Sequence, residues 1–134
     1  MKKKKLVLII CIGVIVLIAT AIYVVFTNIQ NELQSLATAQ IKEIEIDRVS
    51  NGVFKGQFST VLVSAKVEVS VHDNRIADIK LLEHKNGQGK PAEAIIGQVL
   101  ENQTLEVDVI AGATYSSKVI LKAIEDALRK ASSN

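Results

Sequence analysis

The hydrophobic pattern of the chain begins with an uninterrupted apolar run. Leu6 to Phe26 are 21 residues without a charged side chain, and four lysines precede them. A helix of that length spans about 31 Å, close to the hydrocarbon thickness of a bilayer. The run therefore predicts a transmembrane anchor over residues 1–27. A cleaved signal peptide is the alternative, because Ala19 to Ala21 have the small-x-small pattern that cleavage requires.

After the anchor, apolar residues recur at helical spacing among polar ones. Ile29, Leu33 and Leu36 continue this pattern, with Ile41 and Ile44 farther along. The spacing predicts a helical stalk over residues 28–46 that continues the membrane helix. Packing of this segment onto the following domain fits the pattern equally well.

From residue 47 the pattern changes to that of a sheet, and residues 47–134 are predicted to form one domain. Asn51 and Gly52 are a turn signal, and residues 65–71 alternate between apolar and polar side chains. Residues 72–74 then form a turn, and 76–82 return as a second strand. This arrangement predicts an antiparallel hairpin.

The remaining segments contribute two helices. Residues 84–90 are rich in Gly and polar side chains and are predicted to be a loop, and Pro91 suits the first turn of a helix that ends near Asn102. Residues 105–110 are predicted to be a short strand, and 116–131 a helix with one broad apolar face. The fold class is therefore α+β, with a transmembrane helix, a stalk, a hairpin-based sheet and two packed helices.

Charge and cysteine content narrow the function. The whole chain has a formal net charge of +2, but residues 28–134 hold 12 Lys and Arg against 14 Asp and Glu. The excess positive charge therefore belongs to the anchor, and no nucleic-acid footprint is present. Because positive flanks stay in the cytoplasm, the sequence predicts a single-pass cell-membrane protein whose C-terminal domain is extracytoplasmic.

No catalytic or metal-binding constellation is visible in the sequence. Cys11, the single cysteine, lies inside the apolar run, so the domain has no cysteine for a disulfide or a metal site. The acidic residues show no paired spacing, and no Ser-His-Asp arrangement occurs. We therefore assign no catalytic residue and no metal ligand.

The stretch Asp108 to Lys118, "DVIAGATYSSK", has the clearest chemistry. Gly112 and Ala113 remove side-chain bulk, so that a ligand can approach the backbone amides at the start of the following helix. Such a helix start favours an anion, most often phosphate. Hydroxyls and one cation follow at Thr114, Ser116, Ser117 and Lys118. The serines suit either helix capping or secondary phosphate contacts.

The segment from Asp108 to Leu128, "DVIAGATYSSKVILKAIEDAL", resembles the signature of the FMN-binding domain family. That family includes flavin subunits of ion-translocating NADH oxidoreductases and small membrane-anchored bacterial flavoproteins. The resemblance implies that a flavin transferase attaches FMN by a phosphoester to Thr114, with Asp108, Gly112 and Ala113 matching the rest of the motif. Ala111 stands where the motif has Ser or Thr. Non-covalent FMN in the same turn is the alternative.

Other residues are candidates for the flavin ring and its surroundings. Tyr115 is the preferred aromatic partner, ahead of Phe54 and Phe58, and His84 with the following Gly-rich loop is a candidate for the pocket wall.

The implied function is that of a membrane-anchored extracytoplasmic electron carrier. Its partners would be redox donor and acceptor proteins or a quinone. An enzyme is less favoured. The alternatives are a non-redox ligand- or partner-binding module and a flavin-dependent reductase of a small substrate.

Overall fold

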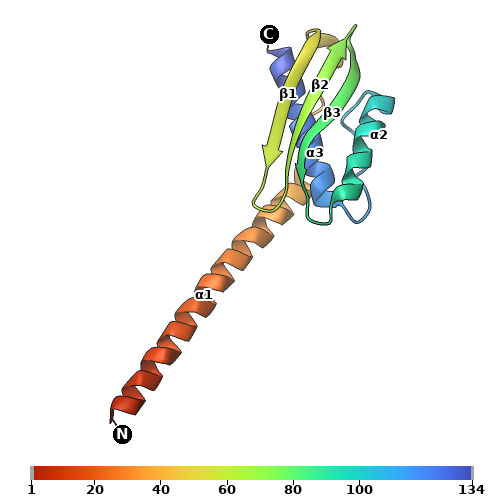
Figure 1. The fold of residues 1–134 in the computed structure, drawn as a ribbon. Helices are drawn as coiled ribbons and strands as arrows, with labels where there is room; N and C mark the ends of the chain where they lie inside the picture. Colours follow the sequence, from red (N-terminus) through yellow and green to blue (C-terminus); the bar gives the residue numbers. More distant parts are fainter. Residues whose placement is uncertain (1, 134) are drawn as a thin grey trace. The chain divides into compact units, whose positions relative to one another are not determined.

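The computed structural model describes residues 2–133 and divides the chain into two compact units. The first unit comprises residues 1–34 and the second residues 35–134. Helix α1, Lys2–Thr38, supplies the first unit and the beginning of the second (Figure 1). An apolar 18-residue window in this helix has a mean hydropathy of 3.1 and no buried residues, so α1 is long and apolar enough to cross a membrane.

The second unit contains a three-stranded antiparallel sheet. Its strands are β1 (Gly52–Ser59), β2 (Ser64–His72) and β3 (Arg75–Lys85), in the order β1-β2-β3. The predicted turn between β2 and β3 is confirmed: Asp73 and Asn74 both have positive φ, at 49° and 57°. Two consecutive residues of that kind match the right-handed twist of the flanking strands.

Two helical segments complete the unit, which confirms the α+β class. The 3-10 helix Lys90–Ala94 leads into α2, Ile95–Asn102, and α3 spans Thr114–Ser132. Helix α3 crosses one face of the sheet (Figure 1). Its apolar side packs on alternate residues of β2, and the largest fully buried side chains of the core include Val67, Val69, Ile120, Leu121, Ile124 and Leu128.

Two features of the predicted secondary structure are wrong. The helix expected to reach residue 46 ends at Thr38. Beyond it, Ile41 and Ile44 pack against the core. The carbonyls of Ala39 and Gln40 accept hydrogen bonds from Lys118 and Lys122 of α3 instead of from helical amides. The alternative of packing onto the domain is therefore the observed one for this segment.

The predicted strand at residues 105–110 is absent, although its apolar residues do face the core. Side chains accept the amides of Leu105, Glu106 and Ile110 in place of a neighbouring strand. Glu43 accepts the amide of Leu105 at 3.2 Å, and Ser117 Oγ accepts that of Ile110 at 3.1 Å. The alternation over residues 105–110 thus predicted burial correctly, but it could not show whether a neighbouring strand is present to pair with them.

Candidate functional site

The stretch that contains Thr114 forms one wall of a small hollow, here called the loop hollow. Its residues come from the end of the β1–β2 turn, the loop after β3 and the start of α3: Val63, Asn86, Gln88, Gly89, Gly112, Ala113, Thr114, Tyr115 and Ser116. Its volume is about 150 Å³. Pockets that enclose a whole small-molecule ligand are usually about 300–1,000 Å³, so this hollow has room for only part of one.

The start of α3 presents an uncapped helix terminus to this hollow. Ala113 is the N-cap residue and no side chain caps the helix. Gly112 has φ of +76°, a conformation that side-chain-bearing residues rarely adopt, so a glycine is required in the turn. The free amides and the positive end of the helix dipole therefore favour an anion here.

The two serines of this segment have different surroundings. Ser117 is fully buried and its hydroxyl accepts the Ile110 amide. This bond fixes the backbone that precedes the turn. Ser116 is also buried, at 3% exposure, and lines the loop hollow. Neither serine acts as the helix cap, which was one of the two roles expected from the sequence.

The opposite wall is the loop after β3, which packs directly on α3. A Cβ atom on Gly89 would collide with Oγ of Ser116 and lie 2.7 Å from its Cβ. Asn86 stabilises this loop through its carbonyl, which accepts the Gly89 amide at 2.7 Å. Val63 and Asn86 were not among the sequence candidates. Asn86 belonged to a loop of recognisable composition, whereas nothing in the local sequence distinguished Val63.

Gly89→Ala is expected to push the loop after β3 away from the start of α3 and so to disturb the hollow. The added methyl group must displace the first turn of α3, because it would meet the Cβ of Ser116 as well as its hydroxyl, and rotation of the hydroxyl alone cannot relieve that contact. We expect a loss of about 1–3 kcal/mol in the free energy of unfolding, measured by urea-induced unfolding. Gly97→Ala is the control for crowding, since a Cβ atom added at Gly97 would have no neighbour within 4 Å. An unchanged stability in Gly89→Ala would contradict the close packing.

His84 lies behind this wall. The loop predicted to begin at residue 84 begins at Asn86 in the structure, because β3 extends to Lys85. His84 therefore lies within β3, and its side chain is 2% exposed. Its Nδ1 is 3.1 Å from Glu93 Oε1 and 3.1 Å from Asn86 Nδ2. Asn86 Nδ2 also donates to the His84 carbonyl at 3.3 Å. His84 does not line the hollow and instead holds Asn86, which does.

The Nε2 atom of His84 is buried and has no hydrogen-bond partner among residues 2–133. A buried polar atom in that condition costs free energy unless a ligand or water satisfies it. The atom is therefore a buried donor or acceptor that residues 2–133 leave unused, on a side chain that contacts Asn86 in the wall of the hollow.

Two other predicted contacts lie outside the loop hollow. Lys118 Nζ donates to the Ala39 carbonyl at 3.0 Å, and Asp108 is exposed beside a different depression with Gln98 and Asn102. Tyr115, at 40% exposure, is the aromatic residue that lines the hollow. Phe54 and Phe58 are half-buried and pack against the core.

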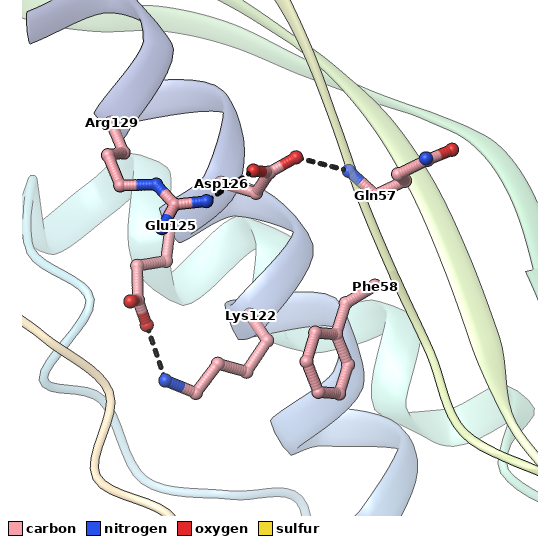
Figure 2. A pocket seen from close by; sticks show the side chains of 6 residues that line it. All are labelled: Gln57, Phe58, Lys122, Glu125, Asp126 and Arg129. Atoms are coloured by element: carbon pink, nitrogen blue, oxygen red, sulfur yellow. Dashed lines mark hydrogen bonds and ion pairs between the residues drawn. The ribbon is translucent and has the colours of Figure 1, made fainter. Parts of the chain in front are cut away.

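A second hollow, here called the charged hollow, lies between β1 and α3 (Figure 2). Its polar groups are already paired. Asp126 accepts the Gln57 amide at 3.1 Å and forms ion pairs with Arg129 and Lys130, while Glu125 pairs with Lys122 at 2.8 Å. The Gln57–Asp126 hydrogen bond joins α3 to the edge of the sheet, while the ion pairs lie within α3, and we interpret the charged hollow as structural.

Asp126→Asn tests this interpretation. Burial raises the pKa of the Asp126 carboxyl, but hydrogen bonds from Lys130, the Gln57 amide and Arg129 outweigh it, so the pKa is lowered overall. The ionised carboxylate thus stabilises the fold above its ordinary pKa near 4, and this contribution is lost as the pH falls through the lowered value.

We expect Asp126→Asn to lower the free energy of unfolding by about 1–2 kcal/mol at pH 7, as measured by urea titration. Below about pH 4 the stability of the variant should depend less on pH than that of the unmodified chain. Asp78→Asn is the control, because Asp78 is exposed on β3. Equal acid sensitivity of Asp126→Asn and the unmodified chain would refute the assignment.

Comparison with known proteins identifies the part of the chain that contains the Thr114 turn. Residues 64–129 match the family described as FMN-binding domain. A stretch of 71 residues, 51% of this chain, is 39% identical to the NADH:acrylate oxidoreductase of Vibrio harveyi. The matched part is 7% of that protein's length, so the similarity concerns one small region of a much larger protein. The family match includes the turn, Thr114 and most of α3, and it confirms the resemblance found in the sequence.

Proposed function

Residues 64–129 belong to the FMN-binding domain family, and from this premise we propose that the chain is a membrane-anchored electron carrier that holds FMN at the start of α3 through a phosphoester to Thr114. The observation that carries this proposal is the position of Thr114. It is the first residue of an uncapped helix and lines the loop hollow together with Gly112 and Ala113.

The residues present fit a phosphate group on three grounds. The uncapped start of α3 offers backbone amides, Gly112 supplies a turn without side-chain bulk, and Ser116 adds a hydroxyl at the hollow. His84, whose buried Nε2 atom has no partner among residues 2–133, contacts Asn86 in the wall of the hollow through Nδ1. The volume of about 150 Å³ suits the phosphate end of FMN and leaves the rest of the molecule outside.

The attachment replaces the proton of the Thr114 hydroxyl. Oγ1 of Thr114 forms the bond to phosphorus, while the bond between phosphorus and the leaving group of an activated flavin nucleotide breaks and the leaving group takes the proton. A flavin transferase is the partner that supplies this step. Asp108 is exposed, and we propose that it belongs to the surface that the transferase recognises rather than to the phosphate contacts.

The roles of the protein are binding and orientation. Bound FMN supplies one- and two-electron redox chemistry. Among the residues that line the loop hollow, Tyr115 is the single titratable side chain. His84 is buried behind the wall, where a soluble substrate cannot reach it. Near the attachment point the site therefore has few groups for proton transfer to a substrate, and this favours electron carriage over a substrate reductase. The match to the FMN-binding domain family favours electron carriage over a non-redox binding module.

The membrane anchor and its sidedness are part of the same proposal. Helix α1 is long and apolar enough to span a bilayer, and the lysines before the apolar run favour a cytoplasmic N-terminus. The domain of residues 47–134, with Ile41 and Ile44 packed against its core, would then be extracytoplasmic and tied to the membrane by α1. Its redox donor and acceptor would be a membrane dehydrogenase or quinone on one side and an extracytoplasmic protein on the other.

The proposal is tested by co-expressing the full chain with a flavin transferase. After purification in detergent, we expect flavin absorbance in the visible range at one FMN per chain, which persists after denaturation and gel filtration. Anaerobic reduction followed by mixing with an oxidised quinone analogue should return the oxidised spectrum. A colourless chain that takes up no FMN would refute the proposal, and flavin lost on denaturation would refute the covalent bond alone.

A further inference from the structure

The turn between β1 and β2 has an unusual composition for its shape. Its central residues are Val61 and Leu62, with exposed fractions of 69% and 53%. Tight turns normally carry Gly, Asn, Asp, Pro or Ser, each for a backbone reason. Two adjacent aliphatic side chains that are more than half exposed gain little from burial within the fold, so they suggest an external apolar contact.

The turn is held firmly in this shape. The amide of Thr60 donates to the Val63 carbonyl at 2.8 Å. The Thr60 hydroxyl donates to the same carbonyl at 3.0 Å and accepts the Val63 amide at 3.0 Å. The aliphatic side chains are therefore presented by a fixed support rather than by a loose loop.

This turn adjoins the loop hollow. Val63, the residue after Leu62, lines the hollow together with Thr114 and Tyr115. Between residues 35 and 133, the exposed large hydrophobic side chains are Val53, Val61, Leu62, Leu82 and Tyr115. Tyr115 lines the loop hollow, and Val61 and Leu62 directly precede Val63, which also lines it. Val53 and Leu82 instead lie within strands β1 and β3.

We propose that Val61 and Leu62 form the platform on which the isoalloxazine ring of FMN packs, with Tyr115 beside it. This inference rests on the proposed function, which places the phosphate at Thr114. The hollow accommodates only the phosphate end, so the flat ring would lie outside it, and this turn is an exposed apolar surface that adjoins the hollow through Val63. Phe54 and Phe58 are used by the core and are not available for that contact.

The composition of the turn favours the ring over a lipid surface. Segments that bind the membrane interface combine apolar side chains with Lys or Arg. Residues 59–65 contain no charged side chain. The turn also adjoins the proposed phosphate site through Val63. This position suits FMN, whose phosphate and ring would be held at the same time.

The platform has two measurable consequences. One face of the ring is shielded from solutes in water, and the apolar contact disfavours the charged reduced form of the flavin. Replacing both aliphatic side chains should therefore open that face and raise the midpoint potential.

The test compares two double variants of the full chain, each co-expressed with the transferase. Val61→Ser with Leu62→Ser removes the platform. Val53→Ser with Leu82→Ser is the matched control, since those residues are 60% and 51% exposed. The measurements are flavin content per chain, quenching of flavin fluorescence by iodide, and the midpoint potential.

We expect equal flavin content in all three proteins and about a twofold larger quenching constant in the platform variant, because iodide then reaches both faces of the ring. Its potential should also rise, while the control matches the unmodified chain. Leu62→Ser alone should give a smaller change in the same direction.

Unchanged quenching and potential at full flavin content would overturn the platform and leave the proposed function standing. The turn would then be a surface for lipid or for a redox partner. Absence of flavin from the unmodified chain would overturn the proposed function and the platform with it.

Discussion

Thr114→Ala is expected to abolish covalent flavin completely when the variant is co-expressed with a flavin transferase. The hydroxyl of Thr114 is the proposed attachment atom, and it begins α3 at the edge of the loop hollow. Neighbouring hydroxyls do not replace it, because Ser116 is buried against Gly89 and Ser117 is committed to the Ile110 amide. The absorbance that remains after denaturation measures the covalent fraction.

Two further variants separate chemistry from shape. Thr114→Ser keeps a hydroxyl at the same position and should retain attached flavin, whereas Thr114→Val keeps the β-branched shape and should lose it. Ser116→Ala should retain the ester bond. Attached flavin in Thr114→Val would contradict the assignment, because that side chain has no oxygen to esterify.

Gly56→Ala is expected to have the largest effect on stability. Gly56 lies on the face of β1 that meets α3, and a Cβ atom there would collide with the carbonyl of Ala123 and lie 2.5 Å from the amide nitrogen of Ala127. Because both neighbours are backbone, the helix must move away from the sheet. We expect a loss of about 3 kcal/mol or more in the free energy of unfolding.

Gly97→Ala is the matched control for this substitution too. Gly97 lies within α2, and a Cβ atom added to it would meet open space, so the change should add up to about 1 kcal/mol of stability through helix propensity. Pulse proteolysis of the full chain in urea measures both variants. Equal stability of Gly56→Ala and the unmodified chain would show that α3 does not pack on β1 as closely as described.

The hydrophobic pattern predicted most of the fold because it records burial directly. Alternation over residues 65–71 gave β2, and the apolar rows of residues 116–131 gave α3 to within two residues at its start. Failures occurred where a tertiary partner decides the outcome. Residues 105–110 alternate as a strand does, yet the amides of Leu105 and Ile110 donate to side chains of Glu43 and Ser117 and not to a neighbouring strand.

The candidate site was predictable to a similar extent. Gly112, Ala113 and Thr114 are contiguous in sequence, so their motif indicated the turn itself. Val63 and Asn86 approach it from distant segments, and no local signal shows such a contact. Lys118 illustrates the converse, because its place in the first turn of α3 suggested a phosphate contact, while its side chain reaches the Ala39 carbonyl.

The central claim is that Thr114 carries FMN, and fragmentation mass spectrometry of one tryptic peptide tests it most directly. Trypsin should release residues 86–118 as a single peptide, since Lys90 is followed by proline. From the chain co-expressed with a transferase, we predict this peptide with the added mass of FMN less one water. Its fragment ions should assign the modification to Thr114 and not to Ser116 or Ser117. An unmodified peptide, or FMN on either serine, would contradict the account.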